Sequence, residues 1–238
     1  MTKSFHNNVD SSTYRIKLII FDFDGTLADS FLWFKSALPL AAKKYGFSLL
    51  SPEEMEKLRS KGTREILKEL NISWWKIPFI AHFMRKNMNK NCHEIKLFPE
   101  IKEMLIYLKS RGYTLALVTS NSLTNVKQIM GSELLEHFDY TECGVSLLGK
   151  KKHFRKLLKS SGLNQNEILS VGDEVRDIEA ARMAGMKSMA VTWGYATKEA
   201  LAAKHPEYLC QHPSDVLAVL RYPEKVEHDA ERSENRDS

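Results

Sequence analysis

Two carboxylates, Asp22 and Asp24, stand two residues apart in the segment Asp-Phe-Asp-Gly-Thr at positions 22–26. They follow the apolar run 18–21, which is typical of a buried strand. A strand that ends in this way places both acids at the carboxyl edge of a sheet, where open α/β folds build their sites. A second acidic group, residues 172–177, follows another apolar run. Together they predict one site for a hard cation and a phosphate.

The elements that must position these acids alternate along the chain. Apolar runs predict strands over 16–22, 113–118, 167–171 and 187–192, with a short extended piece near 138–145. Amphipathic stretches predict helices over 99–110, 121–135, 152–160 and 175–184. Such alternation predicts an α/β fold with a doubly wound, Rossmann-like parallel sheet.

The stretch from 32 to 96 shows helical patterns and no clear strand, so we expect an all-helical insert there. We expect a flexible leader at 1–14, a core formed by 15–31 and 97–222, and a disordered tail at 223–238. Trp33, Trp74 and Trp75 have helical spacing, which favours core positions over a pocket wall.

Composition indicates an ordinary globular protein, with 43% hydrophobic and 27% charged residues in 238. No apolar run approaches the length of a membrane helix, and we expect no secretory signal. Three widely spaced cysteines argue against a disulfide framework and favour the reducing cytoplasm. The sequence favours neither a monomer nor a homodimer.

Positive charge is concentrated in one part of the chain. Residues 33–98 contain 13 Lys and Arg against 6 Asp and Glu, a net charge of +7, whereas the whole chain carries +5. Such a segment would attract anionic substrates, a class that includes a small phosphorylated metabolite. A solvated Lys-rich helical surface explains the charge equally well. No nucleic-acid-binding motif accompanies it, so we expect no nucleic-acid partner.

Four segments in order resemble the motifs of the haloacid dehalogenase superfamily. They are Asp22–Thr26, Val118–Asn121, the region of Lys150, and Gly172–Asp177. The details look closest to its phosphoglycolate-phosphatase-like branch, in which a helical cap of the C1 type follows the first motif. The resemblance covers about residues 16–221. It implies a hydrolase that uses Mg²⁺ and an aspartyl-phosphate intermediate.

Within this resemblance, Asp22 is the nucleophile and Asp24 the general acid and base. An acid at the second position favours phosphate esters over dehalogenation. Gly25 provides tight backbone geometry beside the phosphate. The resemblance assigns Mg²⁺ to the Asp22 side chain, the Asp24 carbonyl and Asp173, with Asp177 as a further ligand or support. Asp177 alternatively lies on the helix surface, paired with Arg176 or Arg182.

The phosphate-binding hydroxyl of the second motif is assigned to Thr119, with Ser120 as the alternative, because adjacent strand residues point oppositely. Asn121 adds a donor or caps the next helix. The motif lysine is assigned to Lys150, just before a helix. Lys151 and Lys152 are alternatives, since the usual Lys-Pro pair is absent.

In the helical insert, the segment 59–64 resembles a loop that reaches the active site in this family. Its cations, Arg59, Lys61 or Arg64, would bind a substrate carboxylate or second phosphate there. Exposed helix-end charges are the alternative. The resemblance suggests phosphoglycolate as substrate. Other possibilities are a phosphomutase, a phosphonate hydrolase that uses Lys61 as a Schiff base, and a non-catalytic binding scaffold.

Overall fold

The sheet is fully parallel. The computed structural model describes residues 15–147 and 149–221, so the expected leader and tail lie outside it, as does residue 222. Six strands pair in the order β3-β2-β1-β4-β5-β6, which confirms the expected α/β sheet. The strands are β1 Leu18–Phe21, β2 Thr114–Val118, β3 Tyr140–Glu142, β4 Ile168–Gly172, β5 Lys187–Val191 and β6 Tyr208–Cys210.

Helices cover both faces of the sheet and fill the segment after β1. The α-helices are α1 Phe31–Tyr45, α2 Pro52–Leu58, α3 Thr63–Glu69, α4 Ile77–Asn91, α5 Ile101–Ser110, α6 Leu123–Met130, α7 Ser132–Leu135, α8 Lys150–Ser161, α9 Val175–Ala184, α10 Lys198–Ala202 and α11 Pro213–Arg221. The 3₁₀-helices are η1 Trp74–Lys76, η2 Cys92–Glu94 and η3 Gln165–Glu167. Within these residues, no helix is both long and apolar enough to cross a bilayer.

Two predicted helix starts are corrected by the structure. Helix α8 begins at Lys150 and not at Lys152, because the Lys152 amide already bonds the Gly149 carbonyl at 3.0 Å. Lys150 is therefore the first helical residue. Helix α5 begins at Ile101 rather than 99, since Glu100 has a φ of +66°, outside the helical region.

Alternate residues of β1 point to opposite faces of the sheet. Ile19 and Phe21 pack in the cluster that includes α5 and α6, whereas Leu18 and Ile20 pack in the cluster that includes α8 and α9. Because both faces are covered, the strand is an unbroken apolar run. Its first polar residue, Asp22, consequently marks the edge of the sheet.

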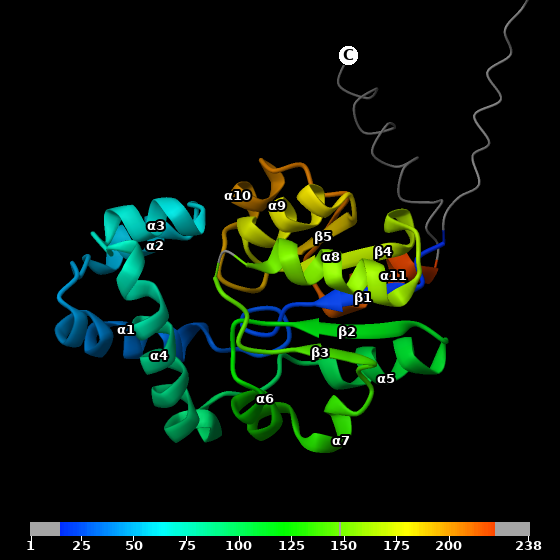
Figure 1. Ribbon diagram of the computed structural model, residues 1–238, viewed down its shortest axis with the longest axis horizontal. Helices are drawn as coiled ribbons and strands as arrows, with labels where there is room; N and C mark the ends of the chain where they lie inside the picture. Colours follow the sequence, from blue (N-terminus) through cyan, green and yellow to red (C-terminus); the bar gives the residue numbers. More distant parts are fainter. Residues whose placement is uncertain (1–14, 148, 222–238) are drawn as a thin grey trace, which may run out of the picture.

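The segment between β1 and α5 forms a helical insert, residues 31–94, with its own apolar cluster. Leu38 on α1, Leu58 on α2 and Leu70 after α3 are buried in it, and α4 packs against α1. Figure 1 shows β1 and β2 pointing toward the insert, so the carboxyl ends of the strands face its helices.

The tryptophan expectation is only partly right. Trp33 on α1 is buried, but Trp74 and Trp75 are 81% and 54% exposed. They lie in the short η1, ahead of the face of α4 that packs inward through Ile80 and Phe83. A three-residue 3₁₀ turn has no continuous face to bury, so helical spacing was misleading here.

Candidate active site

Asp22 lies at the carboxyl end of β1 and is almost fully buried. Its amide donates to the Val171 carbonyl of β4 at 3.0 Å, which continues the sheet ladder past the strand end. Its Oδ1 accepts a hydrogen bond from the Phe23 amide at 2.8 Å. One carboxylate oxygen is thus held by backbone, while Oδ2 faces the charged groups of the site.

Lys150 connects two of these acids. Its Nζ lies 2.5 Å from Asp22 Oδ2 and 2.5 Å from Asp177 Oδ1. Burial lowers the pKa of Lys150, but Asp177 and Asp22 outweigh it, and the pKa lies above its usual value. Of the alternatives, Lys151 is half-buried and Lys152 is exposed. The structure therefore brings Lys150 to the first motif.

Three buried carboxylates converge at this edge. Oxygens of Asp22, Asp173 and Asp177 lie within 4.8 Å of one another. Asp173 Oδ1 accepts from the Thr26 hydroxyl at 2.7 Å, and Oδ2 accepts from the Tyr195 amide at 2.7 Å. Burial, followed by the charges of nearby acids, raises the pKa of Asp173 well above its usual value. Asp177 is buried in this cluster, so it is not a surface acid.

Gly25 allows the first and fourth motifs to approach closely. Its φ is +77°, a conformation that residues with a Cβ rarely adopt. A Cβ here would lie 2.1 Å from Asp173 Oδ2. Any other residue would therefore push Asp173 out of the carboxylate cluster.

The donor set of this cluster fits a hard divalent cation. Three buried acids, Asp22, Asp173 and Asp177, and the partly buried Glu174 face two cations, Lys150 and Arg176. The acids outnumber the cations by two, and a buried carboxylate without a counter-charge is costly. Carboxylate oxygens are the ligands that Mg²⁺ prefers, so the residues present fit this ion.

Asp24 is held by Asn121, which follows β2, and is not one of the three clustered carboxylates. The Asn121 amide nitrogen donates to both Asp24 oxygens, at 3.2 and 3.0 Å. Asn125 fixes the amide orientation by donating to Asn121 Oδ1 at 2.9 Å. Burial, together with the charge of Asp22, raises the pKa of Asp24 to about 6. A carboxyl with that pKa can both donate and accept a proton near neutral pH.

Thr119 and Ser120 both follow β2, in different surroundings. Thr119 is fully buried, and its Oγ1 accepts from the Asn121 amide at 3.0 Å. Ser120 is half-buried and lines the cavity that holds Asp24. Its carbonyl accepts from Arg85 at 3.1 Å. Each hydroxyl remains a candidate phosphate ligand.

Two charged residues of the site, Glu174 and Arg176, were not predicted as functional groups from the sequence. Arg176 Nη2 lies 2.5 Å from Glu174 Oε1 and 3.9 Å from Asp22 Oδ2, and its buried Nε has no partner. Their signal was their place inside the segment 172–177. The alternative that Asp177 is a surface acid paired with Arg176 or Arg182 is wrong, because Asp177 is buried and is bound by Lys150.

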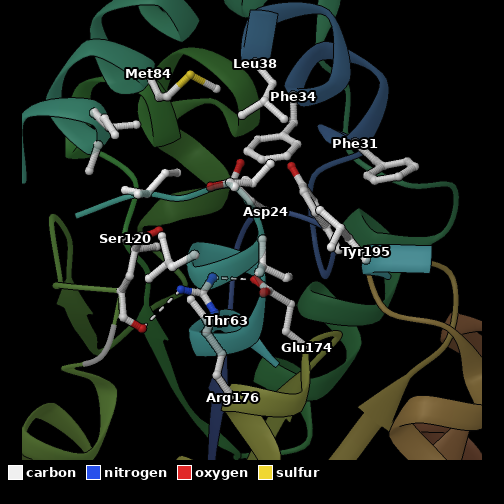
Figure 2. A pocket seen from close by; sticks show the side chains of 18 of the residues that line it. Asp24, Phe31, Phe34, Leu38, Thr63, Met84, Ser120, Glu174, Arg176 and Tyr195 are labelled. Atoms are coloured by element: carbon white, nitrogen blue, oxygen red, sulfur yellow. Dashed lines mark hydrogen bonds and ion pairs between the residues drawn. The ribbon is translucent and has the colours of Figure 1, made fainter. Parts of the chain in front are cut away.

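A cavity of about 250 Å³ opens above Asp24, between the sheet edge and the helical insert. Figure 2 shows Phe34, Leu38 and Met84 on one side of Asp24, and Glu174 and Arg176 on the other. Ser120 and Tyr195 extend it along the core. The cavity therefore joins a charged floor to an apolar roof.

The insert cations expected to bind substrate are placed differently from one another. Arg59 donates to the carbonyls of Tyr195 at 2.8 Å and Gly194 at 3.2 Å, so it joins the insert to the core. Lys61 lines the cavity but is ion-paired with Glu69. Its amine is therefore held by a carboxylate, which weighs against a Schiff base at this position. Arg64 is exposed and is not among the cavity residues.

Comparisons with known proteins agree on one kind of relative. Residues 19–191 match the model of the haloacid dehalogenase-like hydrolase family. A phosphoglycolate phosphatase of Synechococcus elongatus is 30% identical over 206 residues, covering 86% of this chain and 97% of its own.

Solved structures give the same result for the fold. A haloacid dehalogenase-like hydrolase of Streptococcus pneumoniae has a TM-score of 0.69 at 24% identity, covering 85% of this chain and 97% of its own. A predicted phosphoglycolate phosphatase of Haemophilus somnus has a TM-score of 0.66 at 25% identity, with coverage of 86% and 97%.

Proposed function

The chain belongs to the haloacid dehalogenase-like hydrolases, and from that premise we propose that it is a Mg²⁺-dependent phosphatase of small phosphomonoesters. The observation that carries this proposal is the pairing of two unlike carboxyls. Asp22 is buried against Lys150 at 2.5 Å, while Asp24, with a pKa of about 6, is held by Asn121. Phosphoryl transfer to a carboxylate needs one carboxyl as the nucleophile and a second one as the general acid and base.

In the proposed reaction, Asp22 attacks phosphorus and the ester oxygen departs. The protonated Asp24 gives that oxygen its proton, so that an alcohol and not an alkoxide leaves. The same carboxylate then takes a proton from the water that attacks the aspartyl-phosphate. Inorganic phosphate is released and Asp22 is regenerated.

The phosphoryl group would be held by donors that surround Asp22. We assign this role to Lys150, Asn121, a hydroxyl of Thr119 or Ser120, and the backbone at Gly25. Arg176 joins them, because its Nη2 already lies 3.9 Å from Asp22 Oδ2. The negative charge that develops on the phosphoryl oxygens needs such fixed cations.

Mg²⁺ would be held by Asp22, Asp173 and the Asp24 carbonyl, with Asp177 as ligand or support. It would supply positive charge for the phosphoryl oxygens. The excess of acidic groups in the cluster supports this assignment.

We also propose that residues 32–96 act as a cap that covers the site and excludes water. The cavity between insert and sheet edge supports this role. Free cysteines at 92, 143 and 210 support the cytoplasm as the compartment.

The test is phosphate release from a panel of phosphomonoesters, with Mg²⁺ and with chelator. Phosphoglycolate is included because relatives carry that name. We expect turnover that chelation abolishes and Mg²⁺ restores. Absence of phosphate release from every ester in Mg²⁺ would contradict the proposal.

A further inference from the structure

The cavity begins where the leaving alcohol must be. Asp24 lines it, and the group that protonates the ester oxygen must lie within hydrogen-bond reach of that oxygen. The rest of the alcohol therefore extends from Asp24 into the cavity. What lines the cavity beyond Asp24 decides which alcohol is accepted.

Aliphatic and aromatic side chains from every α-helix of the insert line that space. They are Phe34 and Leu38 from α1, Met55 and Leu58 from α2, Ile66 and Leu67 from α3, and Ile80 and Met84 from α4. Ligand pockets of this composition bind apolar groups and orient them through a few polar contacts.

The volume is also larger than glycolate needs. A cavity of about 150 Å³ lined by apolar side chains is enough for benzene, and this one holds about 250 Å³. Glycolate is smaller than benzene. It would leave most of the apolar wall uncovered, so the insert side chains would contribute little to its binding.

The cations of the cavity wall are mostly occupied. Arg59 binds Glu56 at 2.6 Å besides two carbonyls, Lys61 binds Glu69, and Arg176 binds Glu174 at 2.5 Å. A substrate carboxylate at Arg59, Lys61 or Arg176 would have to displace one of these acids. These three cations therefore add little net positive charge to the cavity wall.

Arg85 differs, because within the described part of the chain it has no carboxylate at ion-pair distance. It lies at the catalytic end, where it donates to the Ser120 carbonyl and its own carbonyl accepts from Asn125. Ser120 and Asn125 both adjoin Asn121, which holds Asp24. The charge of Arg85 therefore adds to the phosphoryl end and leaves the far end of the cavity apolar.

We propose that the preferred substrate is a phosphomonoester of an apolar alcohol larger than glycolate, with an alkyl chain or an aromatic ring in the insert cavity. This inference rests on the proposed phosphatase function and names its substrate class. It places specificity in the insert, away from the carboxylates that carry out the reaction.

The test compares kcat/KM for ethyl, butyl, hexyl and phenyl phosphate with that for phosphoglycolate, all with Mg²⁺. Each added methylene should raise kcat/KM about fourfold until the cavity is filled. Hydrolysis of phosphoglycolate should be slower than that of hexyl phosphate. A flat series, or a maximum at phosphoglycolate, would overturn the inference while the phosphatase function stands.

Binding gives a readout that does not depend on turnover. Hexylphosphonate cannot be hydrolysed, and phosphonoacetate carries the carboxylate that phosphoglycolate also has. Calorimetry on the full chain with Mg²⁺ should show tighter binding of hexylphosphonate. Tighter binding of phosphonoacetate would reject the apolar alcohol, even if no ester in the panel were hydrolysed and the phosphatase function itself failed.

A matched pair of variants localises the effect. Met84→Lys places a charge in the cavity, and Met183→Lys makes the same change at a position on α9 that is 52% exposed. The ratio of kcat/KM for hexyl phosphate over phosphoglycolate should fall at least about tenfold in the first and stay unchanged in the second. Equal ratios in both would contradict the inference, and the binding comparison decides it if Met84→Lys does not fold.

Discussion

The floor and the roof of the cavity are built on opposite principles. The floor, at the carboxyl ends of β1, β2 and β4, holds buried charges that are fixed by one another, as in the contacts of Lys150 with Asp22 and Asp177. The roof, formed by the helical insert, presents apolar side chains, and its cations are bound to groups of the protein itself. The floor can stabilise the charge that develops during phosphoryl transfer. The roof can only exclude water and select alcohols by their shape.

This difference separates reaction from selectivity. Changes in the floor should remove chemistry for every substrate, because each fixed charge is part of the same network. Changes in the apolar side chains of the roof should alter which substrate is preferred, because apolar contacts are lost only for alcohols that reach them. The following predictions test the separation, from the largest expected effect to the smallest.

Asp22→Asn should reduce turnover by at least about a thousandfold for every ester, since a neutral amide cannot accept the phosphoryl group. Steady-state phosphate release measures the loss. Far-ultraviolet circular dichroism should be unchanged, because the amide still fits beside Phe23. Retained turnover would remove Asp22 as the nucleophile.

Asp24→Asn should slow alkyl esters by about a hundredfold or more, the usual contribution of a general acid. The donating form is the protonated one, which prevails below a pKa of about 6. In the wild type, phosphoenzyme formation from an alkyl ester should therefore slow as pH rises through about 6. Single-turnover rates across pH should show this limb, and the variant should lack it. An identical limb in both proteins would assign it to another group.

Lys150→Met should lower the free energy of unfolding by about 3–5 kcal/mol and abolish activity, because it leaves Asp22 and Asp177 buried without their cation. Lys152→Met is the matched control. Lys152 is exposed, so its change in unfolding free energy should stay within about 0.5 kcal/mol. Urea denaturation measures both. Equal effects would mean that Lys150 is not the motif lysine.

Arg59→Ala should raise KM about three- to tenfold for all esters and leave their ranking unchanged, because the lost bonds join the insert to Gly194 and Tyr195 and do not reach the substrate. Arg64→Ala, at an exposed position, should have no effect. KM values across the ester panel measure this. A changed ranking would return Arg59 to the role of a substrate-binding residue.

The sequence predicted the floor better than the roof. Strand ends with polar residues, such as Asp22 after β1, are local patterns, and parallel strands must bring them together. The bonds of Arg59 to Gly194 and Tyr195 depend instead on which groups lie opposite an insert loop, and periodicity carries no such information. The same holds for Arg176, whose contact with Glu174 no sequence pattern indicated.

The roof also shows why apolar patterns alone are ambiguous. Trp74 is exposed although its spacing is helical, and Met84 lines a cavity although its spacing is typical of core. A helical stripe reports which residues are apolar, but not whether the opposing surface fills the space between them. An unfilled space in the insert is a property of the packed structure.

The phosphoryl group on Asp22 is the most direct test of the account. A single turnover of enzyme with an alkyl phosphate and Mg²⁺ would be quenched in acid and the protein digested. The mass of the peptide that contains Asp22 would then be measured by mass spectrometry. The account predicts a phosphoryl group on Asp22. Hydroxylamine should remove this group, and it should not form in Asp22→Asn. Turnover without any phosphorylated Asp22, or with the phosphoryl group on another residue, would contradict it.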